Sequence, residues 1–232
     1  MSTSNITINS HDGQSFGAYL SLPPTGRGPG LVVLQEIWGV NAHIRAVADQ
    51  YAADGFVVLA PDVFWRQEPG VDLQYTEADT KKAYHLMQNL DTPNAIADLV
   101  STANALRARP EVTGKIGSVG YCMGGRLSYS MAAAGAVDTA VCYYGGGIQN
   151  QLDVAAQVQV PILFHYAALD AHIPVDAVNA VKAAFAGHKD AVFHDYAGVD
   201  HGFNCWGRPM YNQRAAALAH GRTLEWFATH IA

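Results

Sequence analysis

The stretch Gly120-Tyr121-Cys122-Met123-Gly124-Gly125 decides which fold we expect. It follows the apolar run Lys115–Val119 and precedes the helix-like run Arg126–Ala134. A strand that turns sharply into a helix around one reactive side chain is typical of a nucleophile elbow. Glycines two residues before and after the centre leave room for a strained backbone. Serine is the usual central residue, so Cys122 predicts a nucleophile that attacks with sulfur.

Strand and helix patterns alternate along the rest of the chain. Short apolar runs such as Gly30–Gln35 and Phe56–Ala60 are typical of strands buried on both faces of a sheet. Further strands are expected over Ile6–Asn9, Ser15–Leu20, Thr139–Tyr143, Val160–His165 and Ala191–Tyr196, the first two as an antiparallel pair. Helices are expected over His43–Asp54, Ala78–Asn89, Asn94–Arg107, Val175–Ala186 and Asn212–Thr229. This alternation predicts an α/β fold whose mostly parallel central sheet has helices on both faces.

The composition is that of a compact enzyme. Half of the 232 residues are apolar and 15% are charged, which predicts one domain over residues 1–232. The net charge of −6 argues against nucleic acid or an anionic membrane as a partner. We see neither a secretory signal pattern nor an apolar run of membrane-spanning length. Three widely spaced cysteines do not suggest a disulfide framework, so we expect a cytoplasmic protein. We also expect a monomer rather than an oligomer.

Two loop residues complete the chemistry that Cys122 requires. A sulfur nucleophile needs a base, and the base needs a carboxylate that orients it. Asp170 follows the strand expected to end at His165, and His201 follows the last expected strand. Both therefore belong to the carboxyl edge of the sheet, where ligands bind in such folds. The chain order of nucleophile, acid and histidine is that of the α/β-hydrolase fold.

Five segments together match one known family. They are Gln35-Glu36-Ile37-Trp38-Gly39-Val40-Asn41, the elbow stretch, Tyr143-Tyr144-Gly145, and the loops around Asp170 and His201. On these segments, and over nearly its whole length, the chain resembles the dienelactone hydrolase family of α/β-hydrolases. The resemblance implies that Cys122 is the nucleophile, His201 the base and Asp170 the orienting acid. It also implies a carboxymethylenebutenolidase-like carboxylic ester hydrolase that cleaves a small ester or lactone.

The resemblance assigns roles to three further residues. Glu36 corresponds to a glutamate that contacts the resting cysteine and gates its activation. The backbone N–H groups of Ile37 and Met123 correspond to the oxyanion hole. The start of a helix at Met123 supports this assignment, because the helix dipole and the unpaired N–H groups favour negative charge there.

The expected substrate pocket departs from the family pattern. Well-studied members hold the substrate carboxylate with two arginines, whereas this chain has Lys81 near one of these positions and Cys205 at the other. Arg208 lies three residues beyond Cys205 and is a candidate replacement. The remaining candidates for the pocket are aromatic, namely Trp38, Tyr84, Tyr144 and Trp206. A dienelactone-type acid and a less charged ester or lactone both remain open as substrates.

Other functions are also compatible with the sequence. A carboxylesterase of different substrate range would use the same triad. A thiol redox protein would need Cys142 or Cys205 as resolving cysteine close to Cys122. A ligand-binding relative without hydrolysis is the third alternative. The chain has neither a His-Glu-x-x-His motif nor a Cys-x-x-Cys pair, so we expect no metal, and the triad requires no cofactor.

Overall fold

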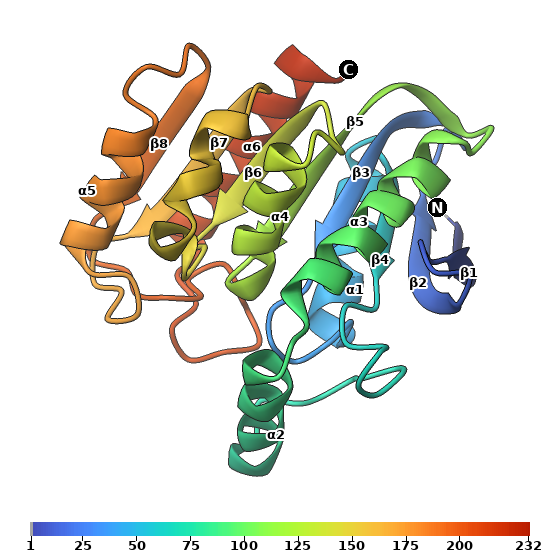
Figure 1. The fold of residues 1–232 in the computed structure, drawn as a ribbon, viewed down its shortest axis with the longest axis horizontal. Coiled ribbons are helices and arrows are strands. Elements are labelled where there is room, and N and C mark those ends of the chain that lie inside the picture. Colours follow the sequence, from blue (N-terminus) through green and yellow to red (C-terminus); the bar gives the residue numbers. More distant parts are fainter. Residues whose placement is uncertain (1) are drawn as a thin grey trace.

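The buried apolar runs become the centre of a sheet in the computed structural model, which describes residues 2–232 (Figure 1). Within these residues, eight strands form one sheet in the order β1-β2-β4-β3-β5-β6-β7-β8. The strands are β1 Ser2–Asn9, β2 Ser15–Leu22, β3 Gly28–Leu34, β4 Val57–Pro61, β5 Val112–Tyr121, β6 Thr139–Tyr143, β7 Ile162–Ala167 and β8 Ala191–Tyr196. Every residue of β4, β6 and β7 is buried, as the continuous apolar runs predicted.

The direction of the strands confirms the predicted sheet. β1 pairs antiparallel with β2, and β2 pairs antiparallel with β4. From β4 to β8, all neighbouring strands are parallel. The carboxyl ends of β3, β5, β6, β7 and β8 therefore meet at one edge, the lower edge in Figure 1.

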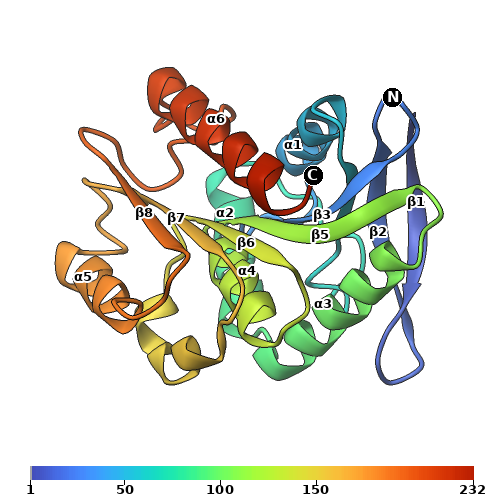
Figure 2. The ribbon, with the colours of Figure 1, turned by 90° about the horizontal axis from the view of Figure 1, so that it is seen from above.

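Helices cover both faces of this sheet. They are α1 Ala42–Ala53, α2 Glu77–Gln88, α3 Thr92–Arg107, α4 Met123–Ala133, α5 Val175–Ala184 and α6 Gln213–His230, with 3₁₀ turns at Ile148–Asn150 and Leu152–Gln157. Figure 2 shows α1 and α6 on one face and α3, α4 and α5 on the other. In Figure 1, α2 stands apart, beyond the carboxyl edge. Among the helices of residues 2–232, none combines the length and the hydropathy that crossing a bilayer requires.

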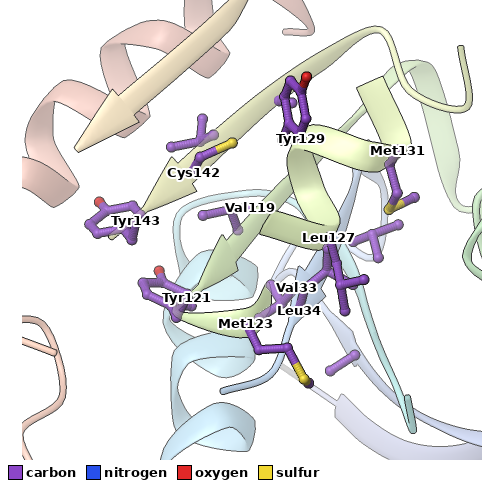
Figure 3. Close-up of a cluster of buried hydrophobic side chains, with 14 of the residues drawn as sticks. Val33, Leu34, Val119, Tyr121, Met123, Leu127, Tyr129, Met131, Cys142 and Tyr143 are labelled. Carbon is purple, nitrogen blue, oxygen red and sulfur yellow. The ribbon is translucent and has the colours of Figure 1, made fainter. Parts of the chain in front are cut away.

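The core that supports the site lies between the middle strands and α4 (Figure 3). Val33 and Leu34 of β3, Val119 of β5 and Leu127 of α4 are all completely buried. Fully burying such a side chain contributes about 1.5–3 kcal/mol. The elbow is thus anchored on both sides, because the strand before it and the helix after it pack into the same core.

Two helix starts differ from the expected ones by more than one residue. α4 begins at Met123 rather than Arg126, because Cys122 itself is the N-cap and the helix follows without a spacer. α3 begins at Thr92 rather than Asn94, because the Asp91 side chain accepts a hydrogen bond from the Asn94 N–H. Pro93 falls in the first turn of α3, where its missing N–H costs no helical hydrogen bond.

Candidate active site

The turn from β5 to α4 presents Cys122 in a conformation that few residues adopt. Its backbone has φ 56° and ψ −116°. The Cys122 N–H donates to the Tyr143 carbonyl at 3.0 Å, and the Cys122 carbonyl accepts from the Gly125 N–H at 3.0 Å. A Cβ at Gly120 would collide with the Gly124 carbonyl, and one at Gly124 would collide with the Leu34 carbonyl. The glycines of the motif are therefore required by close backbone packing.

Asp170 and His201 meet at the same edge, as the sequence predicted. Asp170 lies in the loop after β7, and His201 lies in the loop after β8. His201 Nδ1 donates to Asp170 Oδ2 at 2.7 Å, and both side chains are buried. The other carboxylate oxygen accepts from the backbone N–H groups of His172 and Ile173 at 2.8 and 3.2 Å. These bonds fix the carboxylate, which in turn orients the imidazole.

The protonation of His201 is coupled to Cys122. Burial disfavours the charged imidazolium, but the negative charge of Cys122 and the hydrogen bond to Asp170 outweigh that effect. A further hydrogen bond to Cys122 acts in the same direction, and the pKa of His201 is raised to about 10. The arrangement therefore favours the charged imidazolium form of His201.

A cavity of about 520 Å³ opens over these residues, within the size range of small-molecule sites. Of the expected site residues, its lining contains Ile37, Trp38, Tyr84, Cys122, Met123, His201 and Arg208. Met123 is the first residue of α4, so its N–H is one of those that a helix leaves without an internal partner. Ile37 follows β3 and lines the same cavity as Cys122 and Met123.

Two comparisons of the sequence assign the chain to a family. The sequence profile described as the dienelactone hydrolase family matches residues 16–231. A carboxymethylenebutenolidase from Pseudomonas putida is 36% identical over 229 residues, which cover 98% of this chain and 97% of the relative. The chain belongs to the dienelactone hydrolase family. A carboxymethylenebutenolidase from Pseudomonas sp. strain P51 is 34% identical over 97% of this chain and 94% of its own.

Solved structures agree with this membership. A crystal structure from Klebsiella pneumoniae, provisionally assigned as a dienelactone hydrolase, has a TM-score of 0.87 at 29% identity and covers 99% of each chain. The esterase Pf2001 of Pyrococcus furiosus shares the fold, with a TM-score of 0.73 at 14% identity over 100% of this chain and 94% of its own. The predicted α/β-hydrolase fold is thus confirmed. As a member of the dienelactone hydrolase family, the protein is a hydrolase of ester or lactone bonds.

Three of the expected pocket residues do not line the cavity. Lys81 points into solvent and pairs with Glu77 one turn earlier in α2. Tyr144 is completely buried, and its ring packs against that of His201 with 5.0 Å between the ring centres. Trp206 packs its ring against His43, at 4.3 Å between ring centres. These positions argue against direct substrate contact by Lys81, Tyr144 or Trp206.

Glu36 is held by Arg208 rather than by the nucleophile. Its Oε1 accepts from Arg208 Nη1 at 3.4 Å, and the guanidinium stacks over the Trp38 ring at 4.7 Å. Burial raises the pKa of Glu36, and the positive charges of Arg208 and His201 oppose this shift. The resemblance led us to expect a contact with the resting thiol. Within residues 2–232, the hydrogen bonds of the Glu36 carboxylate do not include one to Cys122.

Arg126 is a pocket residue that the sequence analysis missed. It lies in the first turn of α4 and lines the cavity together with Cys122. Its Nε is buried without a hydrogen-bond partner among residues 2–232, and burial lowers the pKa of the guanidinium. The charge of Cys122 opposes that shift. The spacing in the sequence indicates this position, because a residue four positions after Cys122 projects from the same side of the helix.

Proposed function

We propose that this hydrolase cleaves a small ester or lactone through a Cys122-His201-Asp170 triad and a thioester acyl-enzyme. The observation that carries the proposal is the shared cavity. Cys122 on the strained elbow lines this cavity, and so does His201, which is hydrogen-bonded to Asp170 at 2.7 Å. These are the parts that nucleophilic catalysis requires, namely a nucleophile, a base and a group that orients the base.

The first half of the reaction forms the acyl-enzyme. The Cys122 thiolate attacks the carbonyl carbon, and the electron pair of the carbonyl moves to its oxygen. The N–H groups of Ile37 and Met123 stabilise this oxyanion, and losing one such donor costs about 2.7–4 kcal/mol. When the tetrahedral intermediate collapses, the bond to the leaving oxygen breaks and the His201 imidazolium supplies that oxygen with a proton. A thioester on Cys122 remains.

Water completes the second half. Neutral His201 takes a proton from the water, whose oxygen attacks the thioester carbonyl. Collapse of the second intermediate releases the carboxylic acid and returns the thiolate beside the imidazolium. Throughout the cycle, Asp170 holds the imidazole in one tautomer and stabilises its charged form.

Glu36 acts as a gate in this proposal. A second carboxylate near Cys122 would oppose thiolate formation by like-charge repulsion, and the ion pair with Arg208 restrains it. A substrate that engages Arg208 would release Glu36, so binding and activation are linked. Glu36→Gln should therefore alter the reactivity of the resting thiol toward iodoacetamide, and an unchanged reactivity together with unchanged turnover would contradict the gate.

Two arginines favour an acidic substrate. Arg126 and Arg208 both line the cavity around Cys122, and guanidinium groups bind carboxylates well. The curated relatives are named carboxymethylenebutenolidase, which denotes a lactone that carries a carboxylate. We infer that the substrate is a small lactone or ester with an acidic group.

The deciding experiment is hydrolysis of a panel of small esters and lactones, with dienelactone among them. The wild type should hydrolyse part of the panel, Cys122→Ala should be inactive, and Cys142→Ala should behave as the wild type because Cys142 is buried within β6. Intact mass spectrometry after a rapid acid quench should show the acyl group on the wild-type protein. Full activity in Cys122→Ala would overturn the mechanism, and a folded, reduced wild type that hydrolyses nothing would favour a redox or ligand-binding role.

A further inference from the structure

A second group of reactive side chains lies beside the cavity, and of its three members only Glu36 has a role in the proposed mechanism. Glu36 after β3, His43 in α1 and Cys205 in the loop after β8 bring one donor atom each within 4.8 Å of one another. Glu36 is 1% exposed, His43 5% and Cys205 0%. A carboxylate, an imidazole and a thiol at this separation form a set of ligands that suits a borderline-soft divalent cation.

Two of the three residues in this cluster, Glu36 and His43, have buried polar atoms without the hydrogen-bond partners that such atoms normally have. Glu36 Oε2 and both ring nitrogens of His43 find no hydrogen-bond partner anywhere in residues 2–232. The other carboxylate oxygen of Glu36, Oε1, accepts a hydrogen bond from Arg208, so Oε2 is the atom that can bind a further ligand. A buried histidine with two unpaired nitrogens is costly to a fold unless something binds it.

We propose that Glu36, His43 and Cys205 form a binding site for Zn²⁺, separate from the catalytic pair of Cys122 and His201. In tetrahedral zinc sites with bonds of about 2.0–2.3 Å, ligand atoms lie roughly 3.5 Å apart. The proposal therefore requires donors that are up to 4.8 Å apart to approach one another by about 1 Å on binding. Three protein ligands leave a fourth position for water.

The surroundings of Cys205 suit a metal-bound thiolate. The Cys205 thiol donates to the Tyr75 hydroxyl at 3.2 Å, and this hydroxyl also accepts from Asn41 Nδ2 at 3.2 Å. Zinc binding would release the thiol proton to solvent. The hydroxyl proton of Tyr75 would then be available to donate to the sulfur, so the contact survives with its direction reversed. Such outer hydrogen bonds orient ligands and stabilise the bound metal.

Arg208 sets the strength of the site. Its guanidinium lies beside Glu36 and competes with a cation for the same carboxylate. The Cys205 thiolate and the Glu36 carboxylate together balance the two positive charges of Zn²⁺. The positive charge of Arg208 is then left without a partner, and its side chain lines the cavity. Trp206, whose ring packs against His43, is 44% exposed, so the cluster lies one side chain away from solvent at this point. The sequence gives no warning of the site, since its ligands come from three separate segments.

The test uses full-length protein carrying Cys122→Ala, so that the catalytic thiol cannot bind metal. Competition with a chromophoric chelator should show one Zn²⁺ per chain, and Co²⁺ should give a thiolate-to-metal charge-transfer band. Adding Cys205→Ser should abolish the band and weaken Zn²⁺ binding by at least 100-fold, beyond the roughly 10- to 100-fold that loss of an outer partner costs. The matched control Cys142→Ala should change neither. Thermal unfolding without metal establishes that each variant is folded.

Two further variants separate this site from chance binding at surface histidines. Arg208→Gln should tighten Zn²⁺ binding, because it removes the competing charge, and Tyr75→Phe should weaken it by about 10-fold. Absence of binding to the Cys122→Ala protein would overturn the proposal. Binding that persists unchanged in Cys205→Ser would overturn it as well. Neither result bears on the hydrolytic mechanism, which is tested by the ester panel.

Discussion

The charge state of His201 depends on its contacts with Cys122 and Asp170, and it should control the rate of the reaction. Its pKa is raised to about 10 because the interactions with Cys122 and Asp170 outweigh burial. A raised pKa means that the charged ring stabilises the fold fully below its unfolded pKa of about 6.5. That stabilisation is lost as the pH rises through about 10. Turnover should decline over the same interval, because the imidazolium that protonates the leaving group disappears.

Nuclear magnetic resonance of the His201 ring checks this prediction directly. In the wild type the ring should stay protonated through neutral pH and titrate near 10. In Cys122→Ala, which removes the neighbouring negative charge, the pKa should fall, whereas Cys142→Ala should leave it in place. A wild-type ring that is neutral at pH 7 would show that the thiolate–imidazolium pair does not exist in the resting enzyme.

Arg126 and Arg208 should determine which substrates bind well. Charged hydrogen bonds contribute about 1.5–3 kcal/mol, which corresponds to roughly 10- to 100-fold in affinity. We expect Arg126→Gln and Arg208→Gln to raise KM by this factor for a lactone with a carboxylate, and to change KM little for its methyl ester. Lys81→Gln is the matched control, because Lys81 lies on the solvent side of α2. Equal losses on acid and ester would assign the arginines to folding instead.

At the scale of elements, the close contact between α4 and β3 depends on a missing side chain. A Cβ at Gly124 would overlap the carbonyl oxygens of Leu34 and Gln35, whereas one at Gly221 in α6 meets nothing within 4 Å. Gly124→Ala should lower the free energy of unfolding by about 1–3 kcal/mol, or more. Gly221→Ala should raise it by up to about 1 kcal/mol, because alanine is the better helix former. Urea unfolding of both variants compares two helical glycines with opposite expected signs.

The elements that sequence patterns predicted best are those with one dominant signal. β6 and β8 have the expected bounds, because a loop that contains glycine follows each strand, at Gly145 and Gly198. The elbow was predicted from its glycines, although the start of α4 was placed three residues late, since Cys122 serves as N-cap without any capping side chain. The pocket was harder to predict. Lys81 and Trp206 are close to family positions in sequence, but the direction of each side chain depends on packing between segments that are distant in the chain.

A buried carboxylate joins three segments of the molecule near β1 and β2, at one end of the strand order. Asp98 of α3 accepts hydrogen bonds from Trp65 Nε1 at 2.9 Å and from Arg66 Nε at 2.8 Å, and Arg66 also reaches Asp12 in the turn between β1 and β2. Three segments far apart in the chain therefore meet at one group. Because a single carboxylate serves all of them, its loss should weaken the entire fold rather than one loop.

Asp98→Ala tests this dependence. It leaves the donors of Trp65 and Arg66 without their shared acceptor, and removing one partner of a buried ion pair costs about 3–5 kcal/mol. Since the Arg66 side chain is 21% exposed, we expect a loss of about 2–4 kcal/mol in the free energy of unfolding. Glu77→Ala, which breaks the exposed pair with Lys81, should change it by less than about 1 kcal/mol. In Asp98→Ala, amide hydrogen exchange could become faster in α3 alone while the free energy of unfolding stays unchanged. That result would show that the three segments fold independently of this link.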